Sequence, residues 1–251
     1  PVAFNDKDPQ GYQIDGFEHL SVTATHSSLP ERIELLNKLG FTKKIDLWVY
    51  KIPVRDKIPE LHHKIAERSR RNNPELKLIQ IKNKWQLRDL IVPIFNLVNK
   101  TFNDIYAFSP LQEREMRELS YKYLPVLDKR FVKAIENSEG EIIAFVLAMP
   151  NMSKGIIKSK GRIIPWGLLK IWASQKKTKQ LDMLLGAVHP EYQNKGLDAQ
   201  LAQALFKEAR DAGFEFLDSH LELETNTKMH AENIKLGGEI YKKYRIFQKS
   251  I

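Results

Sequence analysis

The sequence predicts an α+β fold, in which helices flank a sheet that includes an antiparallel hairpin. Three observations predict it. Residues 181–188 form an apolar run that stops near Pro190, and leucines at helical spacing follow, which is typical of strand, turn and helix. Residues 131–135 and 141–148 flank the turn-forming residues Asn-Ser-Glu-Gly, which indicates a hairpin. Residues 45–53 predict a further strand that a proline ends.

Composition limits the class of protein. With 251 residues and 42% hydrophobic residues, the chain can bury a full core in one large domain or two small ones. It has no apolar run long enough for a transmembrane helix, and its zero cysteines exclude disulfides, thiol catalysis and cysteine zinc sites. We expect a cytoplasmic globular protein. Because the chain begins with Pro1 instead of Met, we also expect the natural N-terminus to lie upstream, which leaves a signal there open.

The net charge of +9 raises the question of a nucleic-acid partner. Lysines are spread along the chain, and no nucleic-acid-binding motif accompanies them, so attraction of an anionic cofactor is the favoured interpretation. No membrane partner is expected. His189, His220 and His230 lack the spacing of metal ligands, so no metal site is predicted.

The elements before the apolar run are a strand at 76–81, a helix at 85–102 and a second helix at 111–124. Pro93 predicts a kink in the first helix, and Ser109 is expected to cap the second. Residues 151–179 then form a long insertion, with a basic loop at 154–162 and a helix that Pro165 opens. This helix either packs on the sheet or forms a wall over an acceptor site, and both can hold.

The turn after the apolar run reads Val-His-Pro-Glu-Tyr-Gln-Asn-Lys-Gly and ends at Gly196, where a helix begins. Free backbone N–H groups and the positive end of the helix dipole make such a position an anion site. The segment resembles the acyl-CoA-binding motif of the GNAT N-acetyltransferase superfamily, which has Gln or Arg, two residues, Gly, any residue, and Gly or Ala. A second landmark supports this, since Asn226 ends a strand and Gly237 follows at the family's spacing.

The resemblance implies the GNAT fold, a mixed and mostly antiparallel sheet flanked by helices, with acetyl-CoA as the co-substrate. It also implies direct attack of an amine on the thioester, aided by a base and by a tyrosine that protonates the leaving thiolate. The base candidates are Glu222 and Glu224, with Asp182 on the cofactor strand. Tyr241 and Tyr244 are the candidate acids, and the alternative is that both pack as aromatic residues of a strand. The cofactor-binding residues implied are Ala187, Val188, Gln193, Asn194, Lys195, Gly196, Leu197, Asp198, Asn226 and Asn233.

Two positions depart from the family pattern. Asp198 stands where the motif has Gly or Ala, and Asn233 stands where the family often has its acidic tyrosine. A carboxylate about 5 Å from a phosphate would cost roughly 3 kcal/mol at an effective dielectric of about 20. Asp198 therefore either weakens binding of the cofactor or points outward without harm. Asn233 cannot donate a proton at a useful pKa.

An internal repeat suggests a tandem protein. Lys38-Leu39-Gly40 matches Lys235-Leu236-Gly237, and an aromatic-rich strand follows each. We expect residues 1–53 to be the C-terminal part of a first GNAT-like domain, 54–75 a charged linker with a helix, and 76–251 a complete GNAT-like domain. The alternative is chance recurrence of a helix, a glycine cap and a strand.

Three functions follow from the resemblance. The first is an acyl-CoA-dependent N-acyltransferase that transfers acetyl to the amine of a small molecule or peptide. The second is a GNAT-fold protein that has lost catalysis and serves as a binding module, which the two departures motivate. The third is aminoacyl transfer of the peptidoglycan-bridge type, with charged tRNA as the donor. The sequence does not predict the oligomeric state.

Overall fold

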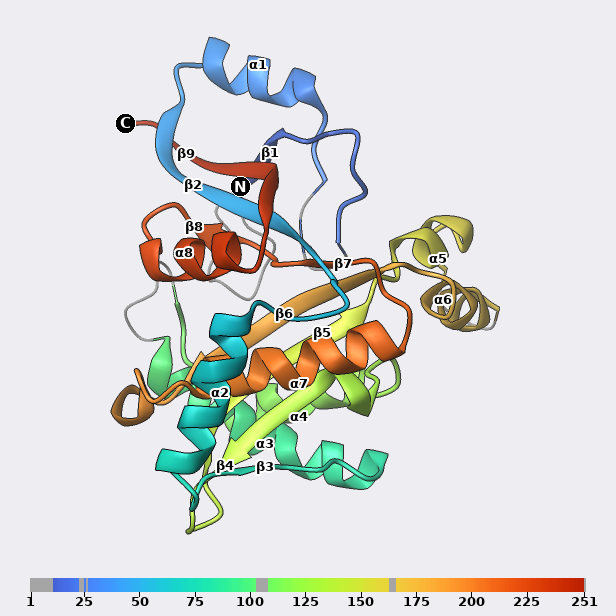
Figure 1. The fold of residues 1–251 in the computed structure, drawn as a ribbon. Helices are drawn as coiled ribbons and strands as arrows, with labels where there is room; N and C mark the ends of the chain where they lie inside the picture. The colour runs from blue at the N-terminus through green and yellow to red at the C-terminus, as the bar shows by residue number, and fades with distance from the viewer. Residues whose placement is uncertain (1–10, 23–24, 26, 103–107, 163–165, 251) are drawn as a thin grey trace. The chain divides into compact units, whose positions relative to one another are not determined.

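The structure is a computed structural model that describes residues 11–22, 25, 27–102, 108–162 and 166–250 (Figure 1). The chain divides into two compact units. The terminal unit contains Pro1–Pro53, Pro150–Asp182 and Glu215–Ile251, and the central unit contains Val54–Met149 and Met183–Phe214. Strand β6 (Gln180–Val188) passes from the first unit into the second after Asp182.

The central unit is a sheet in the order β6-β5-β4-β3 with helices around it. The hairpin predicted from its turn residues is present as β4 and β5, which pair antiparallel. The strand expected at 76–81 is only two residues long. The elements of this unit are α2 (Glu60–Asn72), β3 (Lys77–Leu78), α3 (Lys84–Thr101), α4 (Glu113–Tyr123), the 3-10 turn η1 (Lys129–Phe131), β4 (Val132–Glu136), β5 (Ile142–Pro150), the turn η2 (Pro190–Tyr192) and α7 (Leu197–Asp211).

Apolar periodicity explains how the central unit is packed. Leu87, Ile91 and Ile94 lie one helical turn apart in α3 and are buried, although Pro93 stands inside the helix. Helix α4 begins with a capping box formed by Gln112 and Glu115, so the cap is not Ser109. Helix α2, expected within a linker, packs against α7 and crosses it (Figure 1). The Gln200 side chain donates to Ser69 Oγ at 2.8 Å and joins these two helices.

The terminal unit is a sheet in the order β1-β9-β2-β7-β6, and β8 also pairs with β2. Strand β9 pairs antiparallel with β1 and β2, and β2 pairs antiparallel with β7. Among the described strands of this unit, only β6 and β7 pair in parallel. Leu47, Val49, Tyr244 and Ile246 form its apolar core between β2 and β9. Its elements are β1 (Tyr12–Asp15), α1 (Pro30–Lys38), β2 (Thr42–Pro53), α5 (Ser153–Lys158), α6 (Gly167–Gln175), β7 (Phe216–Asp218), β8 (Glu222–Leu223), α8 (Thr227–Lys235) and β9 (Glu239–Gln248).

The internal repeat has a structural counterpart. Helices α1 and α8 end alike, because Gly40 and Gly237 both have positive φ, 79° and 84°. Phe41 N donates to Leu36 O, as Gly238 N donates to Asn233 O. The strands that follow, β2 and β9, are neighbours in one sheet. A first domain that ended at residue 53 stays a prediction, and residues 1–10 lie outside the described residues.

The insertion is helical where a basic loop was expected. Residues 153–158 form α5, which pairs with α6, while Pro165 lies outside the described residues. The predicted loop was wrong because the helix buries small residues, Ser153 and Gly155, and exposes lysines at 154 and 158. The segment therefore lacks the large apolar residues at helical spacing that indicate a helix.

The predicted fold class is confirmed: the sheet is mixed and mostly antiparallel, and helices flank it. Within the residues described, no helix has both the length and the apolar character needed to cross a membrane.

Candidate active site

The glycine loop, residues 193–198, joins strand β6 to helix α7 in the central unit. Asn194 and Gly196 both have left-handed backbones, with φ of 61° and 76°. Gly196 is the N-cap residue of α7, and no side chain caps the helix there. Left-handed residues within a turn direct successive N–H groups to one side, which forms an anion-binding nest. The helix dipole adds positive potential at the same place.

The N–H groups of this loop are available. The structure gives the amides of Lys195, Gly196 and Leu197 no acceptor among the residues it describes. Asp198 is exposed, and its carboxylate accepts none of these N–H groups. Of the two alternatives for Asp198, the structure therefore supports the one in which the side chain points outward. Lys195 is also exposed, and its Nζ lies 4.5 Å from the centre of the Tyr192 ring.

Gly196 has a packing role that the sequence did not indicate. A Cβ added there would lie 2.9 Å from Ile65 Cγ2 and 3.1 Å from Ser69 Cβ, both in α2. The glycine thus allows α2 to approach the start of α7, in addition to placing its own N–H. The helix expected as a linker is part of the wall of the glycine loop.

Strand β6 has a partner in β7 over only three residues. Gln180, Leu181 and Asp182 pair with Phe216, Leu217 and Asp218, and no pairing with β7 continues beyond them in the described chain. The rest of the strand, residues 183–188, leads into the glycine loop and includes Ala187 and Val188, which are half-buried.

In the terminal unit, Glu222 is a buried carboxylate on β8. Asn233 donates to its Oε1 at 2.7 Å, and His230 Nδ1 lies 3.5 Å from its Oε2. Neither Oε2 nor Nδ1 has a hydrogen-bond partner among the described residues. Burial raises the pKa of Glu222 to about 7.

His230 completes this arrangement. Its Nε2 lies 3.0 Å from Leu223 O, which can only accept, so Nε2 carries the hydrogen. The lone pair of Nδ1 therefore faces Glu222 Oε2 at 3.5 Å. This buried glutamate can exchange a proton near neutral pH.

Glu224 lies in a different environment from Glu222. Strand β8 ends at Leu223, so the alternation expected to place both glutamates on one face does not reach Glu224. Its carboxylate pairs with Lys43 at 2.7 Å and accepts from Asp46 N at 3.1 Å. That pattern is an ion pair at the edge of the sheet.

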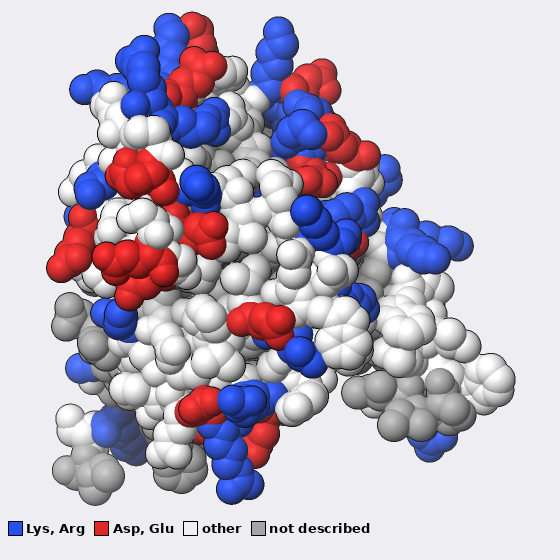
Figure 2. Space-filling model, turned by 90° about the horizontal axis from the view of Figure 1, so that it is seen from below, with Lys and Arg blue, Asp and Glu red and all other residues white. Residues whose placement is uncertain are grey.

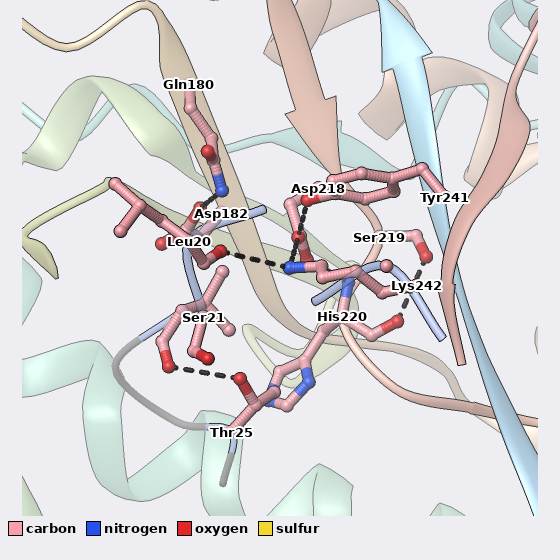
Figure 3. Close-up of polar contacts among 12 residues, drawn as sticks. Leu20, Ser21, Thr25, Gln180, Asp182, Asp218, Ser219, His220, Tyr241 and Lys242 are labelled. Atoms are coloured by element: carbon pink, nitrogen blue, oxygen red, sulfur yellow. Dashed lines mark hydrogen bonds and ion pairs between the residues drawn. The ribbon is translucent and has the colours of Figure 1, made fainter. Parts of the chain in front are cut away.

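A second group of buried charges lies on β6, β7 and β9 (Figure 3). Lys242 Nζ donates to Asp218 Oδ2 at 2.8 Å, and both side chains are fully buried. Asp182 stands opposite Asp218 in the parallel register and accepts from Asn151 and Gln180, each at 2.8 Å. Burial, and next the Asp218 carboxylate, raise the pKa of Asp182 to about 8. We call Asp182, Asp218, Tyr241 and Lys242 the acid cluster.

Tyr241 belongs to this cluster through its hydroxyl, which donates to Asp218 Oδ2. Burial is the main reason that the pKa of Tyr241 is raised, and the Asp218 charge adds to it. Tyr244 is buried in the core, and its hydroxyl reaches Thr25 Oγ1 at 3.4 Å.

Comparison with known proteins decides the family. The pattern of the family described as "Acetyltransferase (GNAT) family" matches residues 91–232, more than half of the chain. The chain belongs to this family. Two curated relatives are a "Bacterial ceramide synthase" of Caulobacter vibrioides, 28% identical over 84% of this chain, and "Protein YghO" of Escherichia coli, 25% identical over 100% of it. The chain spans only 56% and 65% of the length of these two proteins.

Solved structures share the fold. A GCN5-related N-acetyltransferase from Sphaerobacter thermophilus has a TM-score of 0.57 and 11% identity over 91% of this chain and 57% of its own. A tandem GNAT protein from the clavulanic acid biosynthesis pathway has a TM-score of 0.51 and 13% identity over 92% of this chain and 63% of its own. At such identities the likeness shows the GNAT fold alone.

The remaining GNAT landmarks have structural partners in the terminal unit. Asn226 caps α8, accepting from Met229 N at 3.3 Å. Asn233 is buried and binds Glu222, as described above. Their assignment to cofactor binding stays a prediction, as does that of the glycine loop.

Sequence reasoning missed Asp218 and Lys242. A signal for Lys242 was present, because buried and partly exposed residues alternate along β9, and Lys242 belongs to the buried set with Tyr244 and Ile246. A lysine in the inward set of a strand needs a buried carboxylate as its partner. The register that brings Asp218 to it could not be read from the sequence.

Proposed function

We propose that this GNAT protein is an acyl-CoA-dependent N-acyltransferase. The glycine loop carries the proposal, because its N–H groups at Lys195, Gly196 and Leu197 have no acceptor within the described chain. A diphosphate is the kind of anion that such a nest at a helix N-terminus binds. Lys195 adds an exposed positive charge to the same loop. Bound acyl-CoA would supply an activated thioester.

We assign the general base to Glu222. An amine nucleophile must lose a proton, and a base works best when its pKa is near the working pH. Glu222 meets this condition, with a pKa of about 7. Asn233 holds Oε1 and leaves Oε2 directed toward His230, so Asn233 acts as a positioning residue. This gives a role to the residue that departs from the family pattern.

The length of the acyl chain on the CoA donor is the next property to establish. The family description favours acetyl-CoA as the donor. The relative named a ceramide synthase favours a fatty acyl chain and a long-chain amine, since a ceramide is a fatty amide. Competition between acetyl-CoA and palmitoyl-CoA for one limiting amine would decide between the two donors.

The donor site is tested by titration calorimetry with CoA. Asn194 is exposed and left-handed, so Asn194→Gly keeps the loop, whereas Asn194→Val opposes that backbone by roughly 1–2 kcal/mol. We expect the valine variant to bind CoA about tenfold more weakly and the glycine variant to match the parent. The proposal is wrong if the parent does not bind CoA at millimolar concentration, or if the two variants bind alike.

The base is tested by release of the CoA thiol in the presence of a panel of amines. Glu222→Gln should lower kcat and remove the rise in rate with pH around 7, and CoA binding should be unchanged. Glu224→Gln is the matched control, because Glu224 is in a surface ion pair. Equal rates for both variants would remove Glu222 from the mechanism.

Two observations favour catalysis over the non-catalytic alternative, although Asn233 still cannot serve as the acid. Asp198 leaves the loop amides free, and Asn233 holds a carboxylate with a useful pKa. Aminoacyl transfer remains testable by adding charged tRNA in place of acyl-CoA in the same assay.

A further inference from the structure

Most of the chain's excess positive charge lies in one short segment. Residues 151–179 contain eight Lys and Arg residues and no Asp or Glu, in a chain whose net charge is +9. In the described part of this segment, helices α5 and α6 pack against each other as a pair, which we call the α5–α6 hairpin (Figure 1).

The inner face of the hairpin is made of small residues. A Cβ added at Gly155 would lie 2.7 Å from Ile171 Cα, and one added at Gly167 would overlap Arg162 O. The two helices are therefore in close backbone contact, and large side chains have no space between them. Ile171 is the large residue that α6 buries.

The large apolar residues lie on the outer face. Trp166 is 70% exposed, Leu169 is 52% exposed and Trp172 is 40% exposed. They are spaced three residues apart, so they share one side of α6 and its first turn, away from Gly167 and Ile171. Ile157 of α5 is exposed as well. A helix that packs only within its own protein has the opposite arrangement.

Lysines accompany these apolar side chains. Lys170 lies on α6, Lys177 lies in the turn just after α6, and Lys158 lies on α5. Of the eight cations, Lys179 pairs with Glu215, and the others have no ion pair with a described residue. The far right edge of Figure 2 shows white and blue atoms beside the grey ones.

We propose that the α5–α6 hairpin docks on the surface of an anionic lipid bilayer. Trp and Leu side chains beside lysines are the composition of helices that lie in the membrane interface. Indole rings enter the headgroup layer, and each nearby lysine strengthens binding to anionic lipid roughly fivefold. This goes beyond the proposed function and does not depend on it. It also differs from the expectation of no membrane partner, which rested on the lack of a spanning helix.

A nucleic acid is the competing partner for a basic surface. It would use the lysines, and tryptophan could stack on single-stranded bases. It offers no place for Leu169 and Ile157, whereas a bilayer buries both. The lipid surface therefore accounts for all the exposed groups of the hairpin.

The test is co-sedimentation of the chain with vesicles of phosphatidylcholine and phosphatidylglycerol in equal parts, and with phosphatidylcholine alone. We expect binding to the mixed vesicles and at least about tenfold less binding to the neutral ones. Trp166→Ser with Trp172→Ser should lower binding about tenfold or more, and Lys170→Glu with Lys177→Glu should lower it at least as much.

Matched controls lie in α3. Trp85 is 68% exposed, so Trp85→Ser removes an equally accessible indole, and Lys84→Glu reverses an exposed charge beside it. Both should leave vesicle binding unchanged. Circular dichroism of every variant separates lost binding from lost folding.

Two outcomes would overturn the proposal. One is no binding to mixed vesicles at low salt. The other is binding that only the charge variants weaken and that bulk tRNA removes by competition, which would show a nucleic-acid surface instead.

Discussion

The glycine loop and the acid cluster differ in how they are built. The loop offers backbone N–H groups from consecutive residues, and its geometry depends on two left-handed backbones at Asn194 and Gly196. The acid cluster joins side chains from three strands, with Asp218 and Lys242 separated by 24 residues. We expect changes in the local backbone site to cost less stability than changes in the buried charge network, which is part of the core. Four predictions test this difference.

The largest effect is expected at the buried ion pair. Lys242→Met leaves the Asp218 carboxylate buried without its cation and next to Asp182. Removing one partner of a buried pair costs about 3–5 kcal/mol of unfolding free energy. Urea denaturation measures it.

Lys243→Met is the control for this change. Lys243 is adjacent but partly exposed, and it pairs with an exposed Asp15 at 3.4 Å. A surface pair of this kind contributes about 0–1 kcal/mol. Similar losses for the two variants would mean that the acid cluster is not a stabilising part of the core.

The second prediction concerns Gly196. Gly196→Ala places a Cβ 2.9 Å from Ile65 at a positive φ, so we expect a loss of about 2–3 kcal/mol. Gly213→Ala is the matched change, because φ is 80° there and no atom lies within 4 Å, and it should cost about 1 kcal/mol. Equal melting temperatures for the two variants would show that α2 does not pack closely against Gly196.

The third prediction is a dependence of stability on pH. The pKa of Asp182 is about 8 in the folded chain, and the reference value of an aspartate is 3.8. Between these values the folded state holds a proton that the unfolded state has lost, so stability falls as pH rises through this window. We expect a fall of about 2 kcal/mol between about pH 6 and pH 7.5, since one proton corresponds to about 1.4 kcal/mol per pH unit.

Asp182→Asn should flatten this dependence, because Asn stays neutral and Gln180 can turn its amide to bind it. Asp89→Asn, at an exposed aspartate of α3, should leave the slope unchanged. A slope that Asp182→Asn does not reduce would assign the proton to another group, such as Glu222 with its pKa of about 7.

The smallest effect is expected at Asp198. Its carboxylate is exposed, so its repulsion of a bound phosphate is screened by water to about 1 kcal/mol. Asp198→Asn should therefore tighten CoA binding about fivefold without a change in melting temperature, as calorimetry would show. Weaker binding would mean that the carboxylate helps to order the loop.

The local part of the architecture could be predicted because its signals lie within short segments. The apolar run 181–188, its proline and the spaced leucines after it are β6, η2 and α7 in the structure. The strand predicted at 76–81 is only two residues long, because its ladder with β4 contains Lys77 and Leu78, and one further bond, from Ile79 N to Ala134 O, extends it. Strand length depends on the neighbouring strand, which local composition does not specify.

In the candidate site, too, the local motif was predicted and the contacts with distant residues were not. The glycine loop was read from its motif, but the contact of Gly196 with α2 was not, because α2 lies far away in the sequence. Strand alternation predicted that Glu222 and Glu224 share one face of a strand. In the structure β8 ends at Leu223, so Glu222 binds Asn233 whereas Glu224 pairs with Lys43. Nothing in the sequence paired Asp218 with Lys242.

By itself the sequence determined the family, the β4–β5 hairpin, and the strand, turn and helix around the loop that we propose as an anion site, because each depends on neighbouring residues. The tertiary structure alone decided which acids are buried, which lysine faces them and which face of α6 is left outside. The physical reason is that the pKa of an acid and the exposure of a side chain are set by atoms that register and packing bring from distant parts of the chain.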